Sequence, residues 1–212
     1  MTGYFSDVAA LARKDLLLEL RGRDTLPAML LFVASALVIF HFALPSGTGE
    51  LAGLGLLWVA IVFTALLGLS RAFVAEREQG VLDGLVLAPS DRSAIWLGKA
   101  IAAFAFLALA EVVALPLFAL FFSGMDAATV AAVALADIGI CAVGVFVAAM
   151  SIATRARELL LPVLFLPLAI PVIVGGVGAS VTGEARYLGF LALYDAIFLL
   201  VAWASFEYVV AE

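Results

Sequence analysis

Six long apolar runs separated by short polar stretches constrain the fold of this sequence more than any other feature. The runs cover residues 25–44, 51–70, 100–122, 128–153, 159–181 and 187–210. A helix that crosses the hydrocarbon core of a bilayer needs about 20 predominantly apolar residues, and each run is about that long. The pattern predicts an all-α polytopic membrane protein with six transmembrane helices, built as a single transmembrane domain over residues 1–212.

Composition argues against a soluble fold. Hydrophobic residues make up 66% of the chain, charged residues make up 13%, and the mean hydropathy is +1.23. Soluble domains are near half apolar and a quarter charged, so a water-soluble chain of this composition would lack the polar residues to cover its core. The expected surroundings of the chain are therefore the lipid bilayer. No basic cluster is interleaved with aromatic residues, so nothing indicates nucleic-acid binding.

The positions of Lys and Arg predict the orientation of the spans. Residues 1–24, the polar interruption 71–99 and the loop 154–158 carry four, four and two of the eleven basic residues, whereas only Arg186 lies on the opposite side. Loops rich in Lys and Arg stay in the cytoplasm. We therefore expect both termini and the polar interruption to be cytoplasmic.

The segment before the first run predicts an amphipathic helix that lies along the membrane surface. Its apolar residues recur at steps of three and four, at Phe5, Val8, Leu11, Ala12, Leu16 and Leu20. Arg13 and Lys14 lie on the other side, but Asp15 and Glu19 fall within the apolar stripe. We expect these two acids to meet basic groups on a partner or in the polar interruption. The alternative is a solvated leader without a partner.

The fifth run is unusual in its helix breakers. It contains Pro162, Pro167 and Pro171, and then glycines at 175, 176 and 178. Breaks of this kind leave backbone groups free, and such groups must face protein or water. The run is therefore predicted to be broken, either as a kinked span or as a re-entrant segment.

The polar interruption from Arg71 to Lys99 is too charged to lie in hydrocarbon. Each ionised group at the bilayer centre costs roughly 2.5–3.5 kcal/mol, so the segment is expected in water or against another protein. Within it, residues 81–88 are mostly apolar and end before Pro89, and Ser90 or Asp91 can cap the next helix. A short apolar segment between charged arms fits a groove on a partner, or it packs on its own bilayer surface.

The sequence carries no motif of enzyme chemistry. Gly98-Lys99-Ala100 lacks the earlier glycine and the hydroxyl residue of a nucleotide-binding loop. His41 and Cys141 are the sole His and Cys, so the chain has no His cluster and no disulfide of its own. We expect a non-catalytic protein that binds no cofactor directly, with any ATP hydrolysis carried out by a partner chain.

Three acids, Glu111, Asp137 and Asp195, lie inside predicted spans. Ionisable residues within a membrane are costly and are functional candidates by default. No basic residue lies within the spans, which favours protonated carboxyl groups over ion pairs. Two roles remain open: packing or hydrogen bonding between helices or subunits, and lining a transport path.

Four spaced motifs resemble those of the CcmB family, within the wider class of ABC type-2 exporter permeases. They are KDLLLELR at 14–21, LGLSRAFVAEREQGVLDGLVLAPSDRSAIWLGK at 67–99, EVVALPLF at 111–118 and ELLLPVLFLPLAIPV at 158–172. The family supplies the membrane subunit of the haem exporter used in cytochrome c maturation. The resemblance implies a multi-pass permease of the bacterial inner membrane, with haem as its cargo and ATP bound only on a partner subunit.

The resemblance also implies partners and contact residues. The partners are a cytoplasmic CcmA-like ATPase, companion membrane subunits like CcmC and CcmD, and a CcmE-like periplasmic haem chaperone reached through the complex. The implied ATPase contacts are Arg13, Lys14, Asp15, Glu76, Arg77, Glu78, Gly80, Leu82, Leu85, Pro89 and Arg92. No haem ligand is assigned, because the tryptophan-rich haem-handling signature of the companion subunit is absent.

Three alternatives stay open at this point. One is an ABC type-2 permease for another lipophilic cargo. Another is a proton-coupled secondary carrier that uses the three intramembrane acids. The last is a scaffold that lets a companion subunit handle the haem.

Overall fold

The computed structural model describes residues 3–22, 24–45, 49–74, 91–122, 125–152 and 157–211. These ranges form seven helices and contain no strand. The helices are α1 (Tyr4–Gly22), α2 (Thr25–Ala43), α3 (Gly49–Arg71), α6 (Arg92–Phe121), α7 (Ala127–Ile152), α8 (Arg157–Thr182) and α9 (Ala185–Ala211). All but α1 are long and apolar enough to cross a membrane, which gives six spans in the described ranges and confirms the predicted fold class.

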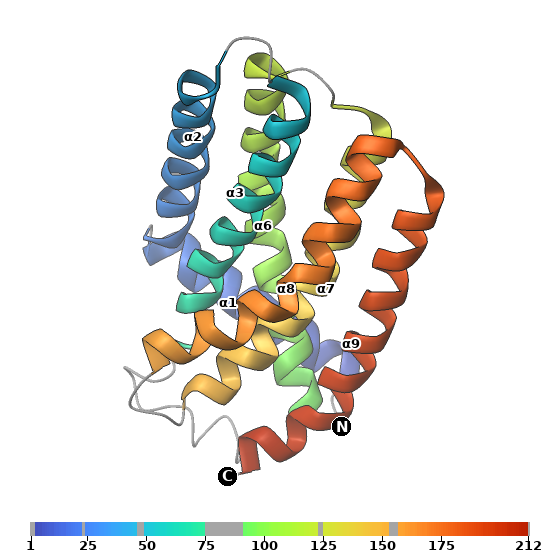
Figure 1. The fold of residues 1–212 in the computed structure, drawn as a ribbon. Helices are drawn as coiled ribbons and strands as arrows, with labels where there is room; N and C mark the ends of the chain where they lie inside the picture. The colour runs from blue at the N-terminus through green and yellow to red at the C-terminus, as the bar shows by residue number, and fades with distance from the viewer. Residues whose placement is uncertain are drawn as a thin grey trace.

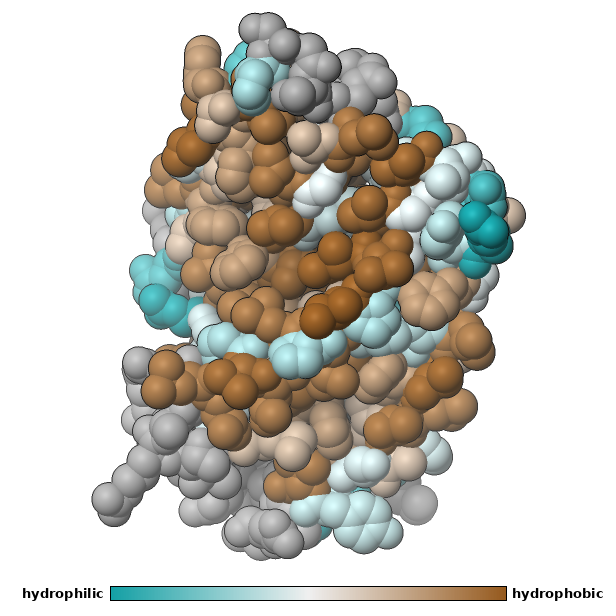
Figure 2. All heavy atoms as spheres, in the orientation of Figure 1, coloured by the Kyte–Doolittle hydropathy of each residue, from teal (hydrophilic) through white to brown (hydrophobic). Residues whose placement is uncertain are grey.

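The spans form a bundle, and α1 lies across one end of it (Figure 1). Both chain termini lie at that same end. Apolar residues cover most of the face of the bundle seen in Figure 2, as expected for a surface in contact with lipid. The placement of α1 agrees with the predicted interfacial helix.

The helix α7 lies at the centre of the bundle, where it contacts α3, α6, α8 and α9. Its glycines allow close approach, because Gly139 packs against Tyr194 of α9 and Gly144 against Leu69 of α3. Lipid tails are as apolar as these side chains, so membrane helices associate through close packing and hydrogen bonds. The small residues of α7 explain why four helices can surround it.

The fifth run forms one helix, α8, with its three prolines inside it. Figure 1 shows α8 changing direction part-way and then reaching the end of the bundle opposite the termini. The kinked span is therefore correct and the re-entrant alternative is wrong. Prolines remove single hydrogen bonds and bend a helix, but the neighbouring bonds continue it. The Tyr194 hydroxyl donates to the Leu168 carbonyl at 2.7 Å and ties α9 to this part of α8.

The helix of the third span begins at the predicted cap, eight residues before the apolar run. The helix α6 starts at Arg92, where the expected span began at residue 100, and Asp91 caps it by accepting the Ser93 N–H at 2.9 Å. Ile95 and Lys99 are buried in this first part of the helix. The expectation that the interruption lies in water or against another protein is thus wrong for residues 93–96, 98 and 99, which are buried inside the chain, Gly98 against α1 and Trp96 against α7.

Candidate functional site

A buried lysine joins three helices at the end of the bundle that carries the termini. The Lys99 side chain is 3% exposed, and its Nζ lies 3.1 Å from Asp15 Oδ2 on α1. The same ammonium group donates to the Ala72 carbonyl at 2.7 Å, directly after the end of α3. It also lies 4.4 Å from the centre of the Phe73 ring. One cation therefore connects α1, the end of α3 and the first part of α6.

This connection explains the acid that interrupts the apolar stripe of α1. A Lys or Asp is almost never buried without a partner, because the charge loses its hydration. Asp15 supplies the negative charge. The Ala72 carbonyl is free to accept a hydrogen bond, because the carbonyls at the end of a helix have no N–H partner within the helix. The expectation that the two acids of the stripe meet basic groups is confirmed for Asp15, whereas Glu19 forms no ion pair with the described residues.

Two further contacts hold the start of α6 in place. The Ser93 and Tyr4 hydroxyls form a hydrogen bond at 3.1 Å, which attaches the beginning of α1. Arg92 donates through Nη1 to the Glu207 carbonyl at 3.4 Å, which attaches the end of α9. We call the helix ends joined by Lys99, Asp15, Ala72, Ser93 and Arg92 the junction. The 75–90 segment connects α3 to α6 and so begins and ends at it.

The residues implied to contact an ATPase fall into two groups. Arg13 is exposed, Lys14 forms an ion pair with Asp15 at 3.0 Å, and Arg92 is partly buried. The structure brings these residues to the same end of the bundle. The others, Glu76, Arg77, Glu78, Gly80, Leu82, Leu85 and Pro89, lie outside the described residues.

The intramembrane acids are all buried, with exposed fractions of 6% for Glu111, 1% for Asp137 and 5% for Asp195. The carboxyl groups of Glu111 on α6 and Asp137 on α7 lie close enough for a side-chain hydrogen bond. Two carboxyl groups can form such a bond only when one of them carries a proton. The Oε1 atom of Glu111 and the Oδ1 atom of Asp137 have no partner in the described part of the chain.

Asp195 occupies a different place. It lies on α9 against Gly139 of α7, and neither of its carboxylate oxygens has a hydrogen-bond partner among the described residues. A methyl group at position 139 would collide with Asp195 and with the neighbouring Tyr194 ring. The structure therefore brings Glu111 and Asp137 together, whereas Asp195 lies separately in the contact between α9 and α7.

The opposite end of the bundle carries the single histidine. The His41 ring stacks on Phe121 with centroids 4.9 Å apart and meets Phe42 and Phe122 edge-on. These ring contacts give His41 a packing role at this end of the bundle. The described ranges contain no group of three His, Cys, Asp or Glu side chains that could hold a metal ion.

Comparison with known proteins places the chain in a family. The family described as CcmB protein matches residues 6–209, which is nearly the whole sequence. The chain belongs to the CcmB family. Its membership confirms the resemblance carried by the four sequence motifs.

Curated members of the CcmB family align along most of the chain. "Heme exporter protein B" of Bradyrhizobium diazoefficiens is 31% identical over 179 residues, covering 82% of this chain and 80% of the relative. "Heme exporter protein B" of Pseudomonas aeruginosa is 34% identical over 185 residues, covering 84% and 81%. The alignments leave only short parts of either protein unmatched.

Sequence reasoning did not identify Lys99 as the partner of Asp15 or the pairing of Glu111 with Asp137. Lys99 lies at the end of the interruption that was expected in water or against a partner, and its burial follows only from the way α1 packs. Glu111 and Asp137 are 26 positions apart on different helices, so their pairing has no local signal. The signal available for Asp15 was its position inside an apolar stripe, and that signal was correct.

Proposed function

We propose that this chain is the membrane subunit of an ABC complex that exports haem, or delivers it to a periplasmic chaperone, during cytochrome c maturation. Membership of the CcmB family, relatives named "Heme exporter protein B" and six apolar spans support this function. Since the sequence carries no nucleotide-binding loop, ATP is hydrolysed on a CcmA-like partner. CcmC-like and CcmD-like subunits complete the complex, and a CcmE-like chaperone receives the haem.

The proposed orientation places the junction in the cytoplasm of a bacterium. Ten of the eleven basic residues lie on the side of the termini, which supports an inner-membrane protein with both termini inside. Residues 1–212 then act as one transmembrane domain. The ATPase contacts the 75–90 segment, including Glu76 and Glu78, together with the exposed Arg13 side of α1.

The Lys99 contact is the observation that carries the mechanism. The segment that receives the ATPase is anchored at one end by α3 and at the other by α6. Lys99 bonds to both the carbonyl after α3 and the carboxylate of α1, so these helix ends move together. A displacement of the segment on ATP binding is thereby passed to two spans and to the interfacial helix. The chain itself performs no chemistry, and haem passes as cargo.

Charge reversal in the segment tests the proposed ATPase contact. Replacing Glu76 and Glu78 with Lys should abolish co-purification of the ATPase, while the protein still inserts in the membrane. Replacing Glu184 with Lys, at the opposite end of the bundle, serves as the matched control and should leave the complex intact. Undiminished co-purification of the Glu76 and Glu78 variants would refute this docking site.

The buried acid pair supports a second candidate function, a proton-coupled secondary carrier. Glu111 and Asp137 can share a proton inside the membrane, and each keeps an oxygen with no partner in the described part of the chain. Transport by the purified chain alone, driven by a pH gradient in proteoliposomes, would favour this function. Transport that requires the ATPase and ATP would reject the secondary carrier. If the ATP-dependent transport moved a cargo other than haem, an ABC type-2 permease for another lipophilic cargo would be favoured.

A further inference from the structure

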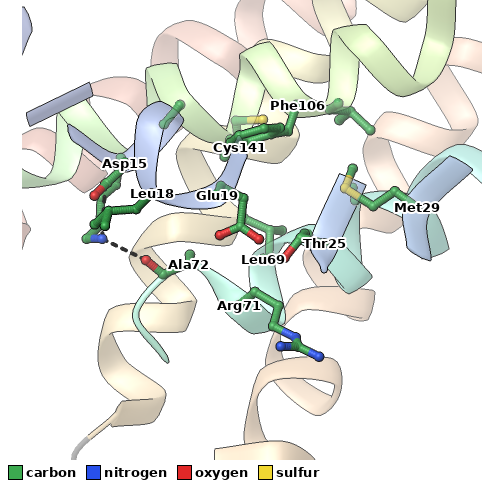
Figure 3. Close-up of a pocket in the computed structure, with 16 residues that line it drawn as sticks. Asp15, Leu18, Glu19, Thr25, Met29, Leu69, Arg71, Ala72, Phe106 and Cys141 are labelled. Atoms are coloured by element: carbon green, nitrogen blue, oxygen red, sulfur yellow. Dashed lines mark hydrogen bonds and ion pairs between the residues drawn. The ribbon is translucent and has the colours of Figure 1, made fainter. Parts of the chain in front are cut away.

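A cavity of about 60 Å³ lies beside the junction, between α1, α2, α3, α6 and α7. Its apolar lining includes Met29, Leu69, Phe106 and Leu107. Its polar lining consists of Asp15, Glu19, Thr25, Arg71 and Lys99. Figure 3 shows the acids coming from α1 and Arg71 from the end of α3. The cavity is therefore amphipathic and lies at the level where the spans meet the interfacial helix.

Three of the polar groups remain available for a ligand. Thr25 is 5% exposed, and its hydroxyl oxygen has no hydrogen-bond partner in the described ranges. Glu19 is partly buried and Arg71 is exposed, and neither belongs to an ion pair within the described structure. In Figure 3 the Glu19 carboxylate and Thr25 lie on one side, and Arg71 extends away from them. By contrast, Asp15 and Lys99 bind each other.

The start of α2 adds a preference for an anionic group beside Thr25. Asp24 stands at the N-cap position but makes no side-chain capping bond. Pro27 has no N–H and the Ala28 N–H bonds to the Asp24 carbonyl, so the free amides at the start of this 19-residue helix are those of Thr25 and Leu26. Uncapped amides and the helix dipole together attract an anion. Arg71 lines the same cavity but extends away from Thr25, so its exposed side chain has to turn inward to bind a phosphate group there.

We propose that this cavity binds the headgroup of an ethanolamine phospholipid. Glu19 accepts hydrogen bonds from the primary ammonium group, and the Thr25 hydroxyl and Arg71 donate to the phosphate. The cavity lining holds two acids, Asp15 and Glu19, and two bases, Arg71 and Lys99, so it carries no net positive charge that would favour a headgroup with only negative charge. A zwitterion fits both signs at once.

The surface of α1 supports a lipid as the source of this headgroup. Leu17, Leu18 and Leu20 are 43%, 42% and 50% exposed, and Leu18 also lines the cavity. Acyl chains can lie along these side chains while the headgroup enters the cavity. Free phosphoethanolamine has the same polar groups but no acyl chains, so it gains nothing from these leucine side chains. The proposal does not depend on the cargo of the complex.

Native mass spectrometry of the purified full-length chain in mild detergent tests this site. The delipidated chain is titrated with phosphatidylethanolamine, phosphatidylcholine and phosphatidylglycerol of matched chain length. We expect the ethanolamine lipid to bind at least about tenfold more tightly than the choline lipid, which has the same phosphate but no ammonium N–H donor. Glu19→Gln should remove this preference, and Arg71→Gln should weaken both zwitterionic lipids.

Matched variants separate binding from folding. Thr25→Ser keeps the hydroxyl and should bind as the wild type does, whereas Thr25→Val should lose affinity. Glu184→Gln, at the far end of the bundle, should change nothing. Equal affinity for the ethanolamine and choline lipids, or preference for phosphatidylglycerol, would overturn the proposal. Competition by free phosphoethanolamine at the affinity of the lipid itself would also overturn it, because the chains would then contribute nothing.

Discussion

Replacing Lys99 with Met tests whether the junction holds the helix ends together. Methionine keeps most of the apolar stem and removes the ammonium group. The Ala72 carbonyl then loses a donor at 2.7 Å, and the Phe73 ring loses the cation above it. Asp15 loses its partner at 3.1 Å but keeps Lys14 at 3.0 Å. The substitution thus removes these contacts and leaves Asp15 paired with Lys14, whose side chain is 37% exposed.

The expected cost in unfolding free energy is about 2–4 kcal/mol. An unsatisfied buried acceptor costs roughly 1–3 kcal/mol, and a cation–π contact contributes roughly 0.5–2 kcal/mol. Removing one partner of a fully buried ion pair costs roughly 3–5 kcal/mol, but the Asp15 side chain is 15% exposed and retains Lys14, which lowers this contribution. The contributions overlap because they describe one ammonium group, so they do not add.

The assay is equilibrium unfolding of the purified chain by a denaturing detergent in mixed micelles. Lys14→Met is the matched control, since its side chain is 37% exposed, and it should cost less than about 1 kcal/mol. Asp15→Asn should cost less in the Lys99→Met background than alone, because the two residues are coupled. A Lys99→Met variant as stable as Lys14→Met, or purely additive effects of Lys99 and Asp15, would refute the role assigned to the junction.

Other positions give further predictions. Gly176→Ala should cost about 1–3 kcal/mol in unfolding free energy because its methyl group would collide with Trp58, whereas Gly55→Ala has open space and should cost less than about 1 kcal/mol. Asp137→Asn should stay within about 1 kcal/mol of the wild type, since an amide still bonds to Glu111, and Asp137→Ala should cost about 1–3 kcal/mol. Asp126→Ala should cost about 0.5–2 kcal/mol through loss of the α7 cap. The Thr129 N–H and hydroxyl donate to Asp126 and lower its pKa. The stabilisation by this cap is therefore present above the unfolded pKa of about 3.9 and is lost as pH falls through the folded pKa. A pH series of unfolding curves checks this, and Asp126→Asn should lack the loss.

The spans were predictable because the bilayer sets their length. Each apolar run had to supply about 20 residues, and the helix bounds agree with the runs to within a few residues except at α6. The cap at Asp91 was also predictable, since an Asp at that position satisfies a free amide of the following helix. These features depend on neighbours in sequence.

The burial of the first part of α6 and the contents of the site were not predictable in the same way. Lys99 is buried because α1 folds back over α6, and that contact joins residues 84 positions apart. The cavity likewise collects Glu19, Thr25 and Arg71 from three helices. A single sequence carries no local signal that identifies which residues on different helices come into contact. The bend of α8 was predictable from its prolines, but its continuity as a span depends on hydrogen bonds that the prolines leave intact.

Accessibility of the 75–90 segment in intact cells tests the central claim most directly. In a Cys141→Ala background, cysteine is introduced by Glu76→Cys or, as the control, by Glu184→Cys, and a membrane-impermeant thiol reagent is added from outside. We predict labelling of the position 184 variant in intact cells and of the position 76 variant only after the cells are opened, with the ATPase subunit protecting it. Labelling of position 76 from outside intact cells would contradict both the orientation and the ATPase contact.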